Sequence, residues 1–104
     1  MTDFLWLFSG GKMPPTEEAR SGAMDAWHLW FEHVGHAVKD LGFPFMPMAR
    51  QVSDGSVTEA RAETTGYLIV QADSVEEVLD LAKGCPVLKA GTKITVFEPF
   101  AVDP

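Results

Sequence analysis

Two short segments of this chain are apolar at every position. Phe4–Phe8 reads FLWLF and Tyr67–Val70 reads YLIV, and aromatic and β-branched residues of this kind favour strands. Successive side chains of a strand point to opposite faces of a sheet, so a run without alternation is apolar on both faces. The two segments therefore predict central strands of a sheet that is covered on both sides.

A short helix is predicted directly after the second of these strands, at Val75–Lys83. Ser74 and Glu77 form a capping box, in which each side chain accepts a backbone N–H at the helix start. Gly84 suits a left-handed residue just past the helix end, and Pro86 cannot continue a helix. We expect Cys85, next to that end, to pack back on the helix as a structural residue.

The first half of the chain predicts a longer helix and a proline-bearing strand. The helix begins at Thr16 or Ser21 and ends before Gly42, with an apolar stripe at a spacing of three or four residues (Trp27, Phe31, Val34, Val38 and Leu41). Phe43–Met48 contains two prolines, which cannot donate to a strand ladder, so it predicts an edge strand or an irregular extended segment.

The remaining segments are shorter. Ser53-Asp54-Gly55 predicts a turn. Residues 57–65 are polar and predict a loop or a weak, exposed strand. Ile94–Phe97 predicts the last strand, and residues 101–104 a tail.

The predicted order is β-α-β-β-α-β, which indicates an α+β protein of ferredoxin-like topology. In that topology an antiparallel sheet carries two helices on one face. A chain of 104 residues predicts a single domain over residues 1–104. Since both central strands are apolar on both faces, the face without helices needs a cover. We predict a homodimer packed through this open sheet face; the alternative is a partly exposed aromatic face or a ligand groove.

Charge and cysteine content limit the possible partners and compartment. The formal charge of −7, without a basic cluster, disfavours nucleic acid and anionic membranes. The single cysteine excludes an intramolecular disulfide, and no Cys/His spacing typical of a metal site occurs. The N-terminal apolar run is too short for a signal peptide or a membrane span. These features fit a cytoplasmic protein, and no motif indicates a metal or a cofactor.

The chain resembles the YCII-related proteins, including the branch called DGPF-domain proteins. The resemblance rests on the strand Phe4–Phe8, the Ala-Trp-containing first helix closing on Leu41-Gly42, Asp54-Gly55, Gly66-Tyr67 through Ala72-Asp73-Ser74, Ala82–Pro86, and a last strand ending in Glu98-Pro99. It implies a ferredoxin-like fold and a dimeric α+β barrel. Some members of the family look like enzymes with a His–Asp pair, and one branch is linked to dehydrochlorination of an aromatic ring.

Set against those members, the chain departs at two places. Counting back from Gly42 puts Phe31 where they carry the proposed catalytic histidine, with His28 one turn earlier. Asp54-Gly55 is followed by Ser56-Val57 instead of Pro-Phe.

His28 is the best candidate for a general acid or base, because imidazole titrates near neutrality. Asp54 could orient such a histidine, although Asp-Gly more simply makes a turn. Arg50 could clamp a carboxylate, although a surface charge is the simpler interpretation. His28, Glu32 and His36 share one stripe of the predicted helix, but the outer two lie roughly 12 Å apart along its axis, too far for one metal ion.

The large apolar side chains also have two interpretations. They could line a pocket for an aromatic ligand, or they could simply form the core. The set comprises Trp6, Trp27 and Trp30 with Met13, Met46 and Met48.

Three functions remain open. The chain could be a small dimeric enzyme, or former enzyme, acting on a small aromatic or polar organic molecule beside the first helix. It could instead be a non-catalytic ligand-binding or regulatory module, or a purely structural dimerisation domain.

Overall fold

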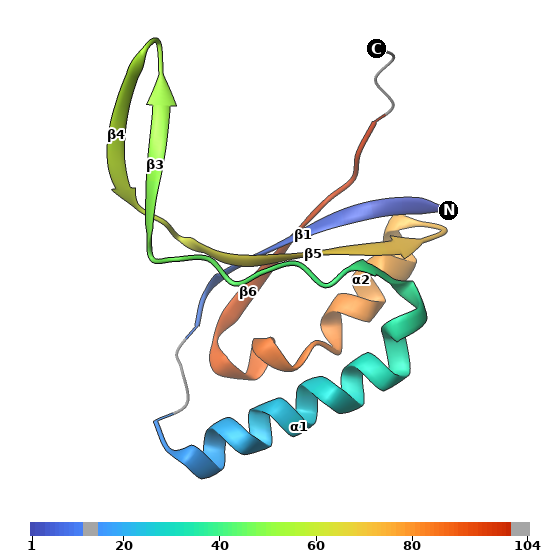
Figure 1. Ribbon diagram of the computed structural model, residues 1–104. Coiled ribbons are helices and arrows are strands. Elements are labelled where there is room, and N and C mark those ends of the chain that lie inside the picture. Colours follow the sequence, from blue (N-terminus) through green and yellow to red (C-terminus); the bar gives the residue numbers. More distant parts are fainter. Residues whose placement is uncertain (12–14, 101–104) are drawn as a thin grey trace.

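The computed structural model describes residues 1–11 and 15–100, and within them four strands form one antiparallel sheet in the order β2-β5-β1-β6 (Figure 1). The central strands are β1 (Thr2–Gly10) and β5 (Thr64–Ala72), and β6 (Thr92–Phe97) lies at one edge. This is the ferredoxin-like strand order. It confirms the predicted α+β fold class and the central position of both doubly apolar segments. Met13 and the tail at residues 101–104 lie outside the described residues.

Both α-helices lie on the same side of this sheet (Figure 1). Helix α1 spans Glu17–Val34, and the Thr16 hydroxyl caps it by accepting the Ala19 N–H at 3.0 Å. Helix α2 spans Val75–Lys83, as predicted, and the Ser74 hydroxyl accepts the Glu77 N–H at 3.2 Å. The Glu77 carboxylate in turn accepts the Asp73 N–H at 3.1 Å, so both side chains cap backbone donors at the start of α2.

The predicted continuation of the first helix to Leu41 is wrong. Helix α1 ends at Val34, a 3₁₀ turn η1 covers Gly35–Ala37, and edge strand β2 occupies Val38–Asp40. Val38 pairs with Val70 on β5, so sheet pairing prevails over the helical spacing of this residue. Of the two alternatives predicted for Phe43–Met48, the structure shows the irregular extended segment. It forms an isolated bridge between Pro44 and Gly66, which fits the missing proline N–H.

A separate hairpin follows, formed by β3 (Met48–Ser53) and β4 (Ser56–Arg61). Asp54 and Gly55 both have positive φ, 46° and 80°, and make the two-residue turn that joins antiparallel strands without distortion. The turn prediction is confirmed. Most of the segment predicted as a loop or a weak, exposed strand is a regular strand, and Figure 1 shows the hairpin standing away from the helices.

The end of α2 differs in detail from the prediction. Gly84 has φ −89° and so is not left-handed; it is Gly91, after the 3₁₀ turn η2 at Pro86–Ala90, that has φ 84°. Cys85 is buried in the core cluster, as expected for a structural residue. The change of direction after α2 therefore combines a short 3₁₀ turn with the fixed φ of Pro86.

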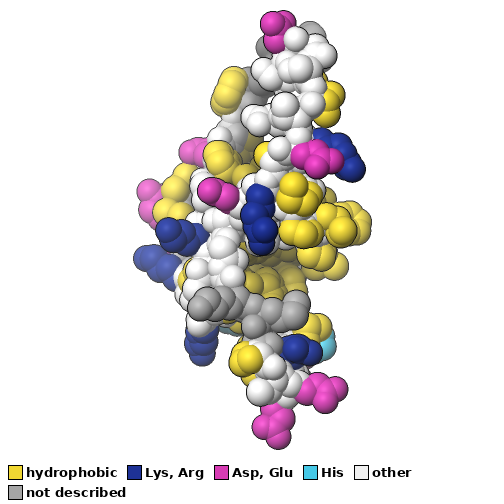
Figure 2. All heavy atoms as spheres, turned by 90° about the vertical axis from the view of Figure 1, so that its left-hand side faces the viewer, with side chains coloured by type: hydrophobic (Ala, Val, Ile, Leu, Met, Phe, Trp, Pro, Cys, Tyr) yellow, Lys and Arg dark blue, Asp and Glu magenta, His cyan; other side chains and the backbone are white. Residues whose placement is uncertain are grey.

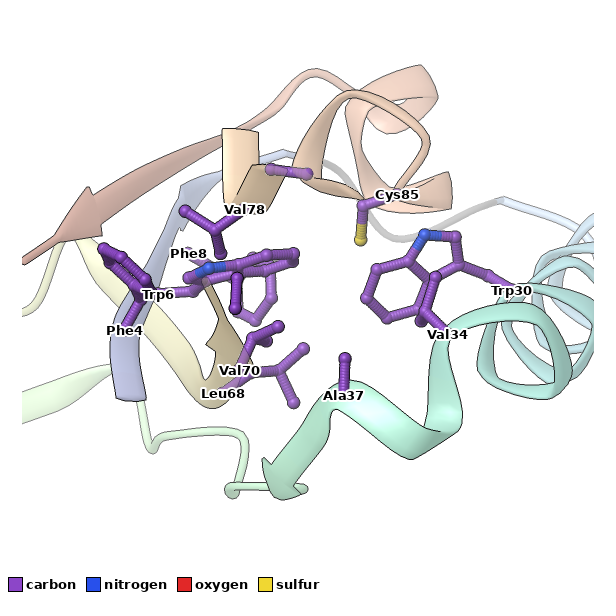
Figure 3. Close-up of a cluster of buried hydrophobic side chains, with 12 residues drawn as sticks. Phe4, Trp6, Phe8, Trp30, Val34, Ala37, Leu68, Val70, Val78 and Cys85 are labelled. Atoms are coloured by element: carbon purple, nitrogen blue, oxygen red, sulfur yellow. The ribbon is translucent and has the colours of Figure 1, made fainter. Parts of the chain in front are cut away.

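The hydrophobic core lies between the helices and one face of the sheet (Figure 3). Its largest fully buried side chains are Trp6, Phe4, Val34, Val70 and Val78. Trp6 packs against Trp30 with ring centroids 5.8 Å apart. Among the described helices, none is long and apolar enough to cross a membrane.

Candidate functional site

An apolar hollow with a volume of about 670 Å³ lies between α1 and the start of β5. Its α1 wall comes from Met24, Trp27, His28 and Phe31. The opposite wall comes from the connection after β2 and from the first residues of β5, including Phe43, Pro44 and Gly66. This volume is within the range of about 300–1,000 Å³ that is usual for small-molecule sites. We call this hollow the α1 pocket.

Aromatic contacts fix the α1 wall. Trp27 stacks on Phe31 with centroids 5.2 Å apart and an interplanar angle of 23°, and it meets Phe8 of β1 edge-on at 6.3 Å. Trp27 also contacts Trp30 edge-on at 5.7 Å. Because Trp27 and Phe31 lie one turn apart on the same side of α1, the helix presents a continuous aromatic surface to the pocket. Such a surface suits the face of a flat ring.

His28 lies on the rim of this surface. Its side chain is exposed to solvent and lines the α1 pocket. No hydrogen bond to its imidazole occurs within residues 1–11 and 15–100, so no described side chain fixes its tautomer. Tyr67 is the other residue with a titratable side chain in the lining. An imidazole beside an apolar floor could exchange a proton with a ligand hydroxyl.

The other predicted site residues lie elsewhere. Trp6 is fully buried and Trp30 is 7% exposed; both belong to the core and neither lines the α1 pocket. Arg50 lies on β3 and Asp54 in the hairpin turn, at the opposite end of the molecule from α1 (Figure 1). Asp54 and His28 of one chain therefore lie in different parts of the molecule. Of the six residues, the structure brings Trp27 and His28 together at one pocket.

Sequence reasoning missed the wall opposite α1. Leu41 and Phe43 line the pocket, although the sequence predicts Leu41 in the helix stripe and Phe43 in an edge strand or an irregular extended segment. Both are largely exposed for apolar residues, at 68% and 70%. The two prolines of residues 43–48 are the sequence feature that could have indicated this wall. They keep the segment out of a regular strand ladder and leave its side chains free to line a hollow.

Among the described side chains, no group of three or more His, Cys, Asp or Glu is arranged to hold a metal ion. His36 lies on η1, after the end of α1, so the predicted single stripe of His28, Glu32 and His36 is wrong. A second hollow lies beside the α1 pocket, between α1 and η2, and a third lies at the base of the hairpin. The third hollow includes Arg61 and Lys93 and is more polar than the α1 pocket.

The sequence matches the family model of the YCII-related domain over residues 12–100. The chain belongs to the YCII-related family. No curated protein matches the sequence. Among solved structures, the chain is similar to 5-chloro-2-hydroxyhydroquinone dehydrochlorinase from Burkholderia phenoliruptrix, solved in complex with 2,5-dihydroxybenzoquinone. The identity is 23%, the TM-score is 0.52, and the match covers 89% of this chain and 90% of the other. At this identity the likeness establishes the fold of this YCII-related protein.

Proposed function

We propose that this YCII-related protein binds a small aromatic or polar organic molecule in the α1 pocket. The observation that carries the proposal is a pocket of about 670 Å³ whose α1 wall is aromatic and whose rim carries the imidazole of His28. Few polar groups on a mainly apolar wall are typical of small-molecule sites. We further propose that residues 1–104 form one domain and act in the cytoplasm.

An enzymatic role for the pocket would rest on His28 as general acid or base. The related dehydrochlorinase acts on a chlorinated hydroxyhydroquinone, and its complex contains a dihydroxybenzoquinone. A molecule of that class, flat and hydroxylated, could stack on Trp27 and Phe31 while a hydroxyl meets the imidazole. We therefore propose hydroxylated benzenes or quinones as the first substrates to test.

Non-catalytic ligand binding is the second candidate, and one observation favours it. A catalytic histidine is usually held by a second group, but His28 has no hydrogen-bond partner within the described residues. The aromatic surface needs no such partner to bind a ring. Binding and catalysis therefore need separate tests.

Tryptophan fluorescence provides the binding test, because Trp27 lines the pocket. Titration with hydroxyhydroquinone, dihydroxybenzoquinone and a hydroxybenzoate should quench the emission with saturation. Met24→Arg, in the pocket lining, should weaken binding by about tenfold or more by analogy with contacts at the centre of a binding site. Leu29→Arg, exposed on the same helix but outside the lining, is the matched control. Saturable binding that both variants retain would rule out this pocket.

Substitution of the histidine separates the two candidates. With a ligand that binds, turnover should fall by roughly 10²-fold or more in His28→Gln, as for loss of a general acid or base. His33→Gln, also exposed on α1, should be unaffected. Ligand binding without turnover in the wild type would leave the non-catalytic module.

We also propose a homodimer packed through the open sheet face. Leu5 pairs across the strands with Ile69 on one side and Phe97 on the other, and Leu7 pairs with Tyr67. These five side chains form an apolar row on the side away from the helices. Leu5 is 37% exposed and Phe97 is 48% exposed. A polar pair at the row's edge, Gln71 donating to Asp3 at 3.1 Å, resembles an interface rim.

The solvent-accessible surface of the chain is larger than expected for a compact monomer, which supports a second copy as its partner. The chain exposes 7896 Å², whereas a compact monomer of its mass exposes about 5,800 Å². The excess of about 2,100 Å² is more than the roughly 800 Å² per partner that a standard interface buries. The neighbouring side chains Phe45 and Tyr67, stacked 5.9 Å apart, extend the same apolar face.

Light scattering tests the dimer directly. The wild type should have twice the monomer mass at micromolar concentration. Ile69→Lys should produce monomers, since a charge would lie at the centre of the row, and Leu29→Lys should leave the dimer intact. A wild type that is monomeric throughout would refute the dimer without touching the ligand proposal.

A further inference from the structure

The β3–β4 hairpin extends away from the rest of the protein. Neither strand joins the four-stranded sheet, and each packs chiefly against the other. Every residue of both strands is exposed except Ala60, which is half-buried. The Cα radius of gyration is 15.6 Å, whereas a compact chain of this length has about 13 Å. A two-stranded hairpin is marginally stable by itself in water, so this one needs a further contact.

The base of the hairpin is firmly attached. The Phe45 N–H donates to the Thr65 carbonyl at 2.8 Å, and the Ala62 N–H donates to the Pro47 carbonyl at 2.9 Å. These bonds continue the strand pairing from the edge of β5 into the hairpin. The base of the hairpin is therefore tied to β5 by backbone hydrogen bonding. Figure 1 shows that it rises on the open side of the sheet, opposite α1 and α2.

The two faces of the hairpin differ in chemistry. Cross-strand partners share a face. One face carries the pairs Met48–Arg61, Arg50–Glu59 and Val52–Val57. The other carries Ala49–Ala60, Gln51–Thr58 and Ser53–Ser56, which are small or polar. Val52 and Val57 are 72% and 62% exposed, although both are residues that packed β-structure favours. The face that carries Val52 and Val57, which we call the valine face, therefore exposes apolar side chains that lack a cover.

Apolar surface connects this face to the open sheet face. Phe45 stacks on Tyr67 of β5, Met46 next to Phe45 in the chain is 79% exposed, and Met48 begins the valine face. In Figure 2 hydrophobic side chains gather at the height of the sheet, between the hairpin at the top and α1 at the bottom. A partner seated on the open sheet face would meet this surface and then the hairpin.

We propose that the β3–β4 hairpin is an arm that clasps a second copy of this chain through its Met48–Val52–Val57 face. The inference rests on the homodimer proposed above and adds a second contact to it. Two-fold symmetry gives each dimer two such contacts, because each copy extends its arm over the other. Arg50 and Glu59, opposite in charge and directly across the strands, lie between the valine pair at one end of the face and the Met48–Arg61 pair at the other.

Adjacent residues of β4 provide a matched test. Val57 and Thr58 are both β-branched and exposed, but they lie on opposite faces. Val57→Lys should raise the dimer dissociation constant by about tenfold or more in sedimentation equilibrium, because the charge enters both symmetric contacts. Thr58→Lys should leave it within about threefold, the range of a rim substitution. Near-ultraviolet circular dichroism checks that both variants fold.

Trypsin gives a second measurement on the unaltered protein. Cleavage after Arg50 should be slow above the dissociation constant and should speed up on dilution, because the clasped arm is protected. Three results would overturn the arm: equal effects of Val57→Lys and Thr58→Lys, no effect of either on a dimeric wild type, or cleavage at Arg50 independent of concentration. A monomeric wild type would instead refute the dimer itself, and the arm with it.

Discussion

The Tyr67 hydroxyl donates a hydrogen bond of 3.0 Å to the Asp40 carboxylate, joining the central strand β5 to the end of edge strand β2. The other carboxylate oxygen accepts the Gly42 N–H at 2.8 Å. One aspartate thus fixes both the edge strand and the turn that leads to the pocket wall at Phe43. The hydrogen bond to Asp40 raises the pKa of Tyr67, with smaller contributions from burial and from the negative charge.

Tyrosinate absorbance can test this contact, because Tyr67 is the only tyrosine of the chain. The wild type should titrate above the ordinary pKa of 10.0, and Asp40→Ala should return the pKa towards it. Asp54→Asn, a change in the hairpin turn, is the control. A raised folded-state pKa means that the stabilisation is complete below about pH 10 and is lost as the pH rises through the folded value. Equal titration of wild type and Asp40→Ala would show that the bond does not form.

Gly42→Ala should destabilise the protein strongly. Gly42 has φ +66°, and a Cβ there would overlap the Tyr67 carbonyl oxygen, which belongs to the central strand and cannot move freely. We expect a loss of more than about 2 kcal/mol in chemical denaturation. Gly22→Ala on α1 is the counterpart, since its Cβ would meet nothing within 4 Å and alanine favours helix by up to about 1 kcal/mol. Destabilisation of the same size at both positions would contradict this account.

Cys85 should react slowly with thiol reagents in the folded protein. Burial raises the pKa of the thiol to about 11, so little thiolate exists at neutral pH. We expect labelling by a disulfide reagent to be slow at pH 8 and to accelerate greatly in guanidinium, with one thiol titrated. Because the folded pKa lies above the ordinary value of 9.0, this group's contribution to stability is complete below about pH 9 and falls as the pH rises towards 11. Rapid labelling of folded protein would indicate an accessible thiol.

Local patterns predicted the parts of the fold that local physics determines. The doubly apolar segments around Trp6 and Leu68 are the central strands, and the capping box at Ser74 begins α2. The end of the first helix was wrong at Val38, whose helical spacing is overridden by pairing with Val70, a residue far along the chain. Single-sequence periodicity contains no information on such a distant partner.

The candidate site was less predictable for the same reason. Trp27 and His28 could be placed beside a pocket because both belong to one helix. The opposite wall at Phe43 depends on where an irregular segment crosses β5, at the bridge from Pro44 to Gly66. Arg50 and Asp54 were plausible by residue type, but the hairpin carries them to the far end of the molecule. Residue type alone does not specify which side chains converge.

The two helix caps should differ in their effect on global stability. Ser74→Ala removes the acceptor of the Glu77 N–H in a helix of nine residues that buries Val78 completely, so the lost bond should lower the unfolding free energy by about 1 kcal/mol. Thr16→Ala removes the equivalent acceptor of the Ala19 N–H, but the buried residues of α1, Trp30 and Val34, lie at its other end. The first turn of α1 can therefore fray without unfolding the core, and its cost should stay below about 0.5 kcal/mol. Urea denaturation gives both unfolding free energies. Hydrogen exchange should show faster opening near Ala19 in Thr16→Ala. Equal losses of global stability in the two variants would mean that the start of α1 unfolds only together with the core.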